Sequence, residues 1–266
     1  MKKIIIAIAA LLFWSSCGHT DPKQSNSLKV GVSSGPEYEL ALTAQKVAKE
    51  QYGLEVELIA FTEYVLPNEA LNNGDLDLNV FQHVPYLEAQ SKQRGYQLSV
   101  VGKTFVFPMV AYSKKITTLE ELATGSSIAL PNDPSNEGRA LLLLQHKGLI
   151  RLRDGVGLLP KVTDITENPK QLKLIEIEAP QLPRVLDDEQ VAIAIINNNF
   201  AAQAGLATAA HHIFSEDSTS AYVNVAVAQT ARKETQAIKD FVKAYQSEPV
   251  AAKAQELFKG GAIRGW

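Results

Sequence analysis

Apolar and polar positions alternate along the chain with two different periods. Residues 28–33 (LKVGVS) and 54–60 (LEVELIA) place an apolar side chain at about every second position, which is the period of a β-strand with one buried face. Residues 37–52 repeat apolar side chains at intervals of three and four, which is the period of a helix with one buried face. The folded part of the chain is therefore predicted to begin as strand, helix, strand.

The same periods, and the glycines and prolines that interrupt them, predict the later elements. Further strands are expected at 76–81, 97–102, 105–113, 127–130, 172–177, 191–196 and 222–228. Helices are expected at 68–73, 85–94, 137–147, 233–246 and 249–258, and the capping-box spacing of Thr118 and Glu121 predicts another helix start. A turn-rich loop is expected at 131–136 and an irregular segment at 151–169. Strands that alternate with helices predict an α/β fold with parallel sheets covered by helices.

The length of 266 residues indicates about two domains, since a domain commonly has roughly 100–200 residues. The segments around 105–113 and 222–228 are the best candidates for connections between them. If both connect two domains, residues 28–107 and 223–266 together form lobe I, and residues 108–222 form lobe II. Two lobes joined by two crossover strands would enclose a cleft, and clefts between domains commonly bind small ligands.

The N-terminal segment has the pattern of a secretory signal. Positive residues precede an uninterrupted apolar run over 4–14, and small residues then lead to Cys17, the only cysteine in the chain. This pattern predicts a signal peptide over 1–16 and a lipid attached to Cys17 after cleavage, although Trp14 stands where leucine is usual. The alternative is an ordinary cleaved signal with an incidental cysteine. Residues 17–27 are mostly polar and are predicted to be a tether.

Composition and charge exclude several classes of protein. The chain is 45% hydrophobic and 21% charged, which is ordinary for a folded soluble protein and unlike a disordered chain. Its 26 basic and 29 acidic residues give a net charge of −3, so we expect no affinity for nucleic acid. The sequence has no CxxC, HExxH, GxxxxGK[ST] or GxGxxG motif, and its histidines lack the spacing of metal ligands. We therefore expect neither a metal ion nor a cofactor.

One motif fits an enzyme. Residues 31–35 (GVSSG) match the G-x-S-x-G pattern of a nucleophile elbow and lie between a predicted strand and a predicted helix. A secreted serine hydrolase would use Ser33 as nucleophile. Its acid and base would come from Asp187 or Asp188 and from His211 or His212. However, only the tether precedes this first strand, so nothing upstream supplies the second oxyanion amide. The alternative interpretation is that the two glycines permit a tight turn, and that the adjacent histidines are the exposed start of a strand.

Aromatic residues follow two of the predicted strands. Tyr64 comes just after 54–60, and Phe81, His83 and Tyr86 lie at and after the end of a later strand. The carboxyl ends of parallel strands meet at one edge of a sheet, which is where the wall of a cleft would lie. Aromatic faces can hold an aliphatic or thioether side chain, and a sulfur–ring contact contributes about 0.3–1.5 kcal/mol. The alternative is that some of these rings only fill the core beneath the loops.

A second set of candidates is polar. Arg139 follows the loop 131–136 at the start of a helix, and a guanidinium there can bind a carboxylate through two parallel hydrogen bonds. The positive end of the helix dipole would add to that attraction. Asn197 and Asn224 lie at or near strand ends, where an amide can accept from an ammonium group and donate to a carboxylate. The alternatives are a solvated arginine and asparagines that cap turns.

Five segments of the chain resemble one known family. They are residues 56–90, 131–150, 154–170, 178–197 and 260–266. In these segments the sequence is similar to the NlpA lipoprotein family, and the resemblance covers essentially all of residues 28–266. It implies a two-lobed periplasmic-binding-protein fold of type II with the ligand cleft between the lobes. It also implies a receptor, without catalysis of its own, that captures free methionine and delivers it to the membrane permease and ATPase of an ABC importer.

The resemblance also assigns roles to individual residues. The wall around the methionine side chain would be formed by Tyr64, Phe81, His83 and Tyr86. Arg139 would bind the carboxylate, and the polar partners of the charged ends would be Asn136, Asn197 and Asn224. The expected ligand is L-methionine, with D-methionine as a further candidate, and the alternatives are another small amino acid or a methionine-containing dipeptide. We expect a monomer in the cell envelope, anchored through Cys17 on the periplasmic face of a bacterial membrane.

Overall fold

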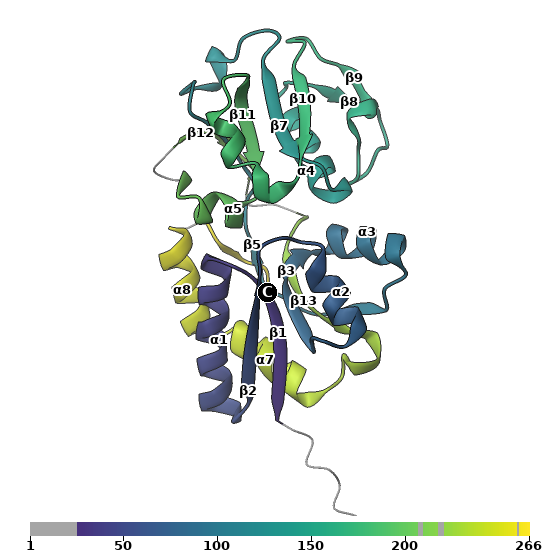
Figure 1. Cartoon of the computed structure of the whole chain (residues 1–266), viewed down its shortest axis with the longest axis vertical. Coiled ribbons are helices and arrows are strands. Elements are labelled where there is room, and N and C mark those ends of the chain that lie inside the picture. Colours follow the sequence, from purple (N-terminus) through teal and green to yellow (C-terminus); the bar gives the residue numbers. More distant parts are fainter. Residues whose placement is uncertain (1–25, 207–209, 218–220, 260) are drawn as a thin grey trace, which may run out of the picture.

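The structure is a computed structural model, and it describes residues 26–206, 210–217, 221–259 and 261–266. The predicted signal peptide, Cys17 and most of the predicted tether lie outside the described residues. Within the described part of the chain, no helix is long and apolar enough to span a bilayer. The described elements form two five-stranded sheets, which lie one above the other along the long axis of the molecule (Figure 1), and two short two-stranded sheets.

The first sheet contains the first strands of the chain and one late strand. Its order is β2-β1-β3-β13-β4, from β1 (Ser27–Ser33), β2 (Glu55–Phe61), β3 (Leu78–His83), β4 (Leu98–Lys103) and β13 (Asn224–Gln229). One face is covered by α1 (Pro36–Tyr52), α7 (Gln236–Tyr245) and α8 (Glu248–Phe258), and the other by α2 (Leu66–Asn73) and α3 (Val84–Arg94) (Figure 1). A separate cluster of buried apolar side chains lies on each face.

The second sheet is built in the same way. Its order is β10-β7-β11-β6-β12, from β6 (Val110–Ser113), β7 (Ser127–Pro131), β10 (Lys173–Ile177), β11 (Val191–Ile196) and β12 (His211–Ser215). Helix α4 (Pro134–His146) packs its leucines on one face. The other face is covered by α5 (Asn198–Gln203) and two 3₁₀ turns, Ala179–Gln181 and Arg184–Asp187.

Both sheets are mixed, whereas the alternation of strands and helices predicted parallel sheets. β1, β2 and β3 are parallel, as are β7, β10 and β11, but β13 is antiparallel to both of its neighbours. In the second sheet, β6 is antiparallel to both β11 and β12. The antiparallel strands β6 and β13 are those that enter a sheet from the other one.

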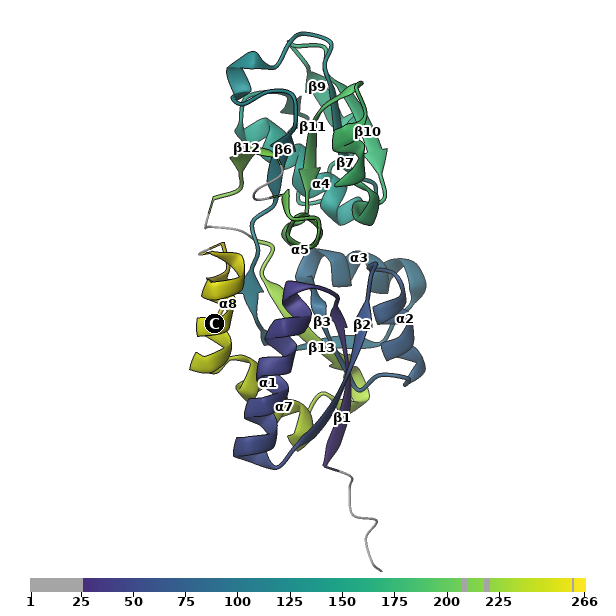
Figure 2. The same ribbon diagram turned by 60° about the vertical axis from the view of Figure 1, so that its left-hand side comes forward.

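The chain passes between the sheets twice. The first passage lies between β5 (Phe105–Val106), which pairs with β14 (Ile263–Arg264), and β6. The second lies between β12 and β13. In Figure 2 helix α5 lies between the two groups of elements. We accordingly keep lobe I as 28–107 with 223–266, and lobe II as 108–222, as the proposed division.

Two local predictions were wrong. The capping box at Thr118 gives only a 3₁₀ turn, Leu119–Glu121, and Thr118 makes no side-chain cap bond. Instead the Glu121 carboxylate accepts hydrogen bonds from the backbone N–H and the hydroxyl of Thr117, at 2.8 and 3.0 Å, so it caps a tight turn rather than a helix. The segment predicted to be irregular contains a short antiparallel pair, β8 (Arg151–Leu152) and β9 (Ile165–Glu167).

Helix α4 begins at Pro134, inside the predicted loop. Asp133 is the N-cap, since its Oδ1 accepts the backbone N–H of Asn136 at 3.0 Å. Proline is well suited to the first helical position because it has no N–H to satisfy there. Asn136 therefore lies in the first turn of a rigid helix rather than in a loop, and Arg139 lies one turn further on.

Gly138 lets α4 pack closely against the loop that follows it. An added Cβ would lie 2.7 Å from the backbone oxygen of Leu158 and 2.9 Å from Cδ of Pro160. We expect Gly138→Ala to lower the free energy of unfolding by about 1–3 kcal/mol, because neither contact can be relieved by a side-chain rotation. Thermal denaturation checks this. An unchanged midpoint would mean that the loop moves away without cost.

Candidate functional site

A cavity lies between the two groups of elements, and its empty space of about 370 Å³ includes open solvent. All of the residues predicted to bind the ligand line it: Tyr64, Phe81, His83, Tyr86, Asn136, Arg139, Asn197 and Asn224. The structure thus brings together residues from the elements of both five-stranded sheets.

Three rings form an apolar wall on the side of lobe I. The ring centroids of Tyr64, Phe81 and Tyr86 are each 5.9 Å apart, with interplanar angles between 36° and 78°. The Tyr86 hydroxyl donates to the backbone oxygen of Tyr64 at 2.9 Å, which fixes the two rings relative to each other. Phe200 of α5, in lobe II, packs against the Tyr64 ring with the two ring centroids 4.9 Å apart. Such a surface suits an aliphatic or thioether group.

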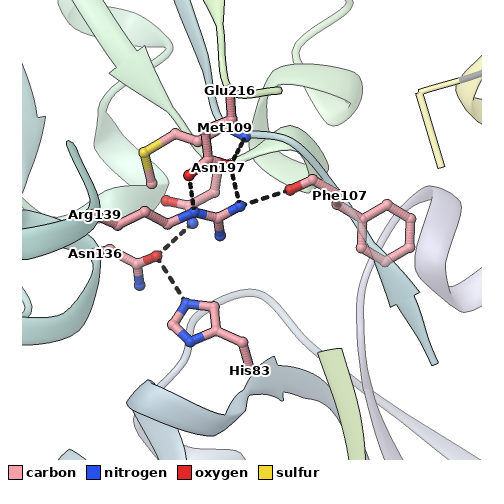
Figure 3. Close-up of polar contacts among 7 residues, drawn as sticks. All are labelled: His83, Phe107, Met109, Asn136, Arg139, Asn197 and Glu216. Atoms are coloured by element: carbon pink, nitrogen blue, oxygen red, sulfur yellow. Dashed lines mark hydrogen bonds and ion pairs between the residues drawn. The ribbon is translucent and has the colours of Figure 1, made fainter. Parts of the chain in front are cut away.

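His83 links the wall to the polar part of the cavity. The backbone N–H of Tyr86 donates to its Nδ1 at 3.2 Å, so the proton of the neutral ring is on Nε2. Nε2 lies 3.2 Å from Oδ1 of Asn136 in the other lobe and donates to it (Figure 3). Burial, and the nearby positive charge of Arg139, lower the pKa of His83 to about 3. The ring is therefore a neutral hydrogen-bond donor throughout the physiological pH range.

Asparagine side chains continue this chain of hydrogen bonds through lobe II. Asn197 donates from Nδ2 to Oδ1 of Asn136 at 2.8 Å, and Asn136 donates from Nδ2 to the Asp133 carboxylate at 2.9 Å. Asn199 accepts a hydrogen bond of 2.6 Å from the Tyr64 hydroxyl. Within the described residues, Oδ1 of Asn197 and Nδ2 of Asn199 are buried without a hydrogen-bond partner. A buried acceptor and a buried donor are thus available to a ligand.

Arg139 is buried, with 3% of its surface exposed, and is held by groups of the chain itself. Its Nε and Nη2 donate to the two oxygens of the Glu216 carboxylate at 2.7 and 2.5 Å, and Nη2 also donates to the backbone oxygen of Phe107 at 3.0 Å. The guanidinium carbon lies 4.6 Å from the centre of the Tyr222 ring. In Figure 3, Glu216 lies on one side of the guanidinium, and His83 lies on the other.

This arrangement refines the role predicted for Arg139. The edge that could form two parallel hydrogen bonds to a carboxylate is occupied by Glu216, which the sequence analysis did not single out. Glu216 compensates a charge that would be costly to bury alone. The remaining terminal nitrogen, Nη1, is on the side of His83 and Asn136 (Figure 3). A ligand carboxylate in the cavity would therefore meet Nη1 rather than the paired edge.

Five lining residues were missed by the sequence analysis: Glu37, Gln82, Phe107, Asn198 and Asn199. A signal existed for two of them, since Asn198 and Asn199 continue the asparagine run that follows β11. Asn224 lies opposite His83 in the strand pairing, and its Nδ2 donates to the backbone oxygen of Phe81 at 3.4 Å.

The hydrolase arrangement is not assembled. Ser33 is the last residue of β1, in regular pairing with Phe61, and its backbone lacks the positive φ of a strained elbow. Its hydroxyl is hydrogen-bonded to the buried Glu37. The four proposed partners lie in the other lobe: Asp187 pairs with Lys114, Asp188 accepts the N–H of Gln190, and His211 and His212 are exposed on β12. Among the described residues, no group of three potential metal ligands occurs either.

A family model matches almost all of the folded chain. The model is that of the NlpA lipoprotein family, and it covers residues 28–266. The D-methionine-binding lipoprotein MetQ of Yersinia pestis is 58% identical, over 99% of this chain and 98% of that protein. Lipoprotein 28 of Escherichia coli strain K12 is 52% identical, over 90% of this chain and 88% of that protein.

Solved structures have the same fold. A crystal structure of the methionine-binding protein MetQ superposes with a TM-score of 0.88 at 57% identity, covering 91% of this chain and 99% of that one. A nutrient-binding protein from Burkholderia cenocepacia, solved with methionine bound, gives a TM-score of 0.86 at 47% identity, covering 90% of this chain and all of the other. These neighbours are two-lobed substrate-binding proteins, and the predicted α/β, two-lobed fold class is confirmed.

Proposed function

The chain belongs to the NlpA lipoprotein family, and from this premise we propose that it is the receptor of an ABC importer for methionine. It captures the free amino acid between its lobes and delivers it to a membrane permease that is driven by an ATPase. One observation carries the proposal. A single cavity combines an aromatic wall with a buried arginine and amide groups whose polar atoms are available.

The chemistry of each part of the cavity fits one part of methionine. The thioether chain would lie against the rings of Tyr64, Phe81 and Tyr86, where sulfur–ring contacts are favourable. The carboxylate would accept from Nη1 of Arg139, and the ammonium group would donate to amide oxygens such as Oδ1 of Asn197. Both charges of a zwitterion thereby find partners, which is required once water is excluded.

Ligand selectivity tests this proposal. Calorimetry on the purified protein should show that methionine binds at least about tenfold more tightly than leucine or glutamine. Leucine has the wrong shape for the wall, and glutamine would bury an amide among rings without hydrogen-bond partners, at a cost of about 1–3 kcal/mol. Including D-methionine in the series establishes the stereochemical range. Equal affinities for methionine, leucine and glutamine would instead support a receptor for small amino acids in general.

The remaining features of the proposal concern the cell. We propose that Cys17 is lipidated after removal of residues 1–16, which anchors the receptor on the periplasmic face of a bacterial membrane. The relatives named as lipoproteins support this. We propose further that the receptor acts as a monomer, and that it has no catalysis of its own because its task is selective binding and release.

A further inference from the structure

Glu37 is a buried carboxyl that lines the cavity, and none of the ligand contacts proposed above involves it. It lines the cavity with Tyr64 and Arg139, and only 4% of its surface is exposed. It lies in the first turn of α1, where the chain leaves β1. Among the described residues no cation pairs with it, because the buried guanidinium of Arg139 is paired with Glu216. An ionised Glu37 would therefore be a buried negative charge without a compensating positive charge.

The surroundings of Glu37 place the pKa of its carboxyl close to neutral pH. Burial raises its pKa to about 8, and the hydrogen bond with Ser33 offsets only part of that effect. The positive end of the α1 dipole favours the anion, so the ionised form is not far away in free energy. At neutral pH the free receptor carries Glu37 mainly as a neutral acid, and a positive charge placed beside it would favour ionisation.

The elements packed around α1 contribute few other charges near Glu37. The titratable groups close to it are the hydroxyls of Tyr64 and of Tyr245 on α7, whose pKa values are raised by burial, with a further contribution from the charge of Glu37. Across the cavity are Arg139 and the neutral His83. The charged residues of β1, β2, α7 and α8 form ion pairs on the surface, either with one another or with residues of α1, of β14 and of the segment before α7. These pairs are Lys29–Glu57, Lys49–Glu55, Lys239–Glu234, Lys243–Asp240, Lys253–Glu256 and Arg264–Glu248. Helix α5 has no titratable residue.

Resting on the proposed function, we propose that Glu37 is the anionic partner of the ligand's ammonium group and releases its proton when the ligand binds. In this step the O–H bond of the Glu37 carboxyl breaks, and the proton passes to the solvent. The ammonium group of the ligand keeps its three hydrogens. The cavity then holds two opposite pairs of charges, with the ligand carboxylate near Arg139 and the ligand ammonium near Glu37. Amide oxygens such as that of Asn197 complete the shell of acceptors.

Calorimetry with methionine, in buffers that differ in their enthalpy of ionisation, tests the proposal. At about pH 7 we expect close to one proton to be released per methionine bound. The sign of the pH dependence follows, because the free receptor binds more protons than the complex does. Affinity should rise by up to about tenfold per pH unit between about pH 5.5 and pH 7.5, and level off above the pKa of the free carboxyl, about 8.

Two matched variants locate the proton. Glu37→Gln should remove the proton release and flatten the pH profile, while it keeps the shape of the side chain. Glu137→Gln is the control, since burial raises the pKa of Glu137 to about 7 beside Glu176, and this variant should keep both effects. The proposal is overturned if methionine binds without proton release, or if Glu137→Gln removes the release and Glu37→Gln does not. Absence of methionine binding in the unmodified protein would instead contradict the proposed function.

Discussion

Replacing Arg139 with alanine should weaken methionine binding by about 2–5 kcal/mol, which corresponds to a loss of roughly thirtyfold to several thousandfold in affinity. The reason is that the ligand carboxylate would be buried without a positive partner. Arg139 is buried and is held in place by Glu216 and by the backbone oxygen of Phe107. Among the described residues, no other cationic side chain lines the cavity and could replace it. Calorimetric titration of the variant with methionine measures the loss.

A loss of fold must be separated from a loss of binding in this experiment. Without Arg139, the Glu216 carboxylate is left mostly buried and unpaired, which destabilises a protein by about 3–5 kcal/mol in comparable cases. The double variant Arg139→Ala/Glu216→Gln relieves that charge and should recover thermal stability without recovering affinity. Arg153→Ala is the matched control, because Arg153 makes an ion pair with Asp164 on the surface. This variant should bind methionine as tightly as the unmodified protein does. Affinity regained by the double variant would mean that Arg139 only supports the structure.

Replacing Asn136 with leucine should also weaken binding, because the Oδ1 of Asn136 accepts hydrogen bonds from side chains of both lobes. That oxygen accepts from Nε2 of His83 in lobe I and from Nδ2 of Asn197 in lobe II. Leucine has a similar size but no acceptor, so two buried donors lose their partner at a cost of about 1–3 kcal/mol each. Since one of the two bonds joins the lobes, the closed form is destabilised relative to an open form by about 1–3 kcal/mol, and affinity should fall roughly fivefold to 150-fold.

Asn168→Leu provides the comparison for this variant. Asn168 also lies in lobe II, and its side chain makes two hydrogen bonds with the backbone of Leu172, away from the cavity. Both variants should lower thermal stability, but only Asn136→Leu should lower the affinity for methionine. Unchanged affinity in Asn136→Leu would show that the bond between the lobes does not contribute to ligand capture.

Much of this protein is determined by short-range pattern. The period of apolar residues located the main strands and helices, because burial of one face requires that spacing whatever the rest of the chain does. The aromatic wall followed from position alone. Tyr64 follows β2 and Phe81 lies near the end of β3. These two strands run parallel to β1 on either side of it, so their carboxyl ends lie at one edge of the sheet. The signal pattern ending at Cys17 is likewise a property of the sequence by itself.

Only the tertiary structure determined which charged groups of the cavity are buried and which of them are paired. Arg139 and Glu216 are 77 residues apart, and Tyr64 and Asn199 are 135 apart, so no local pattern relates the members of either pair. The direction of β13 was likewise decided by the path of the chain between the lobes. Whether a buried carboxyl or guanidinium carries a compensated charge depends on which distant segment packs beside it. Burial and pairing of charge are properties of the assembled interior, and the sequence specifies them only through the fold as a whole.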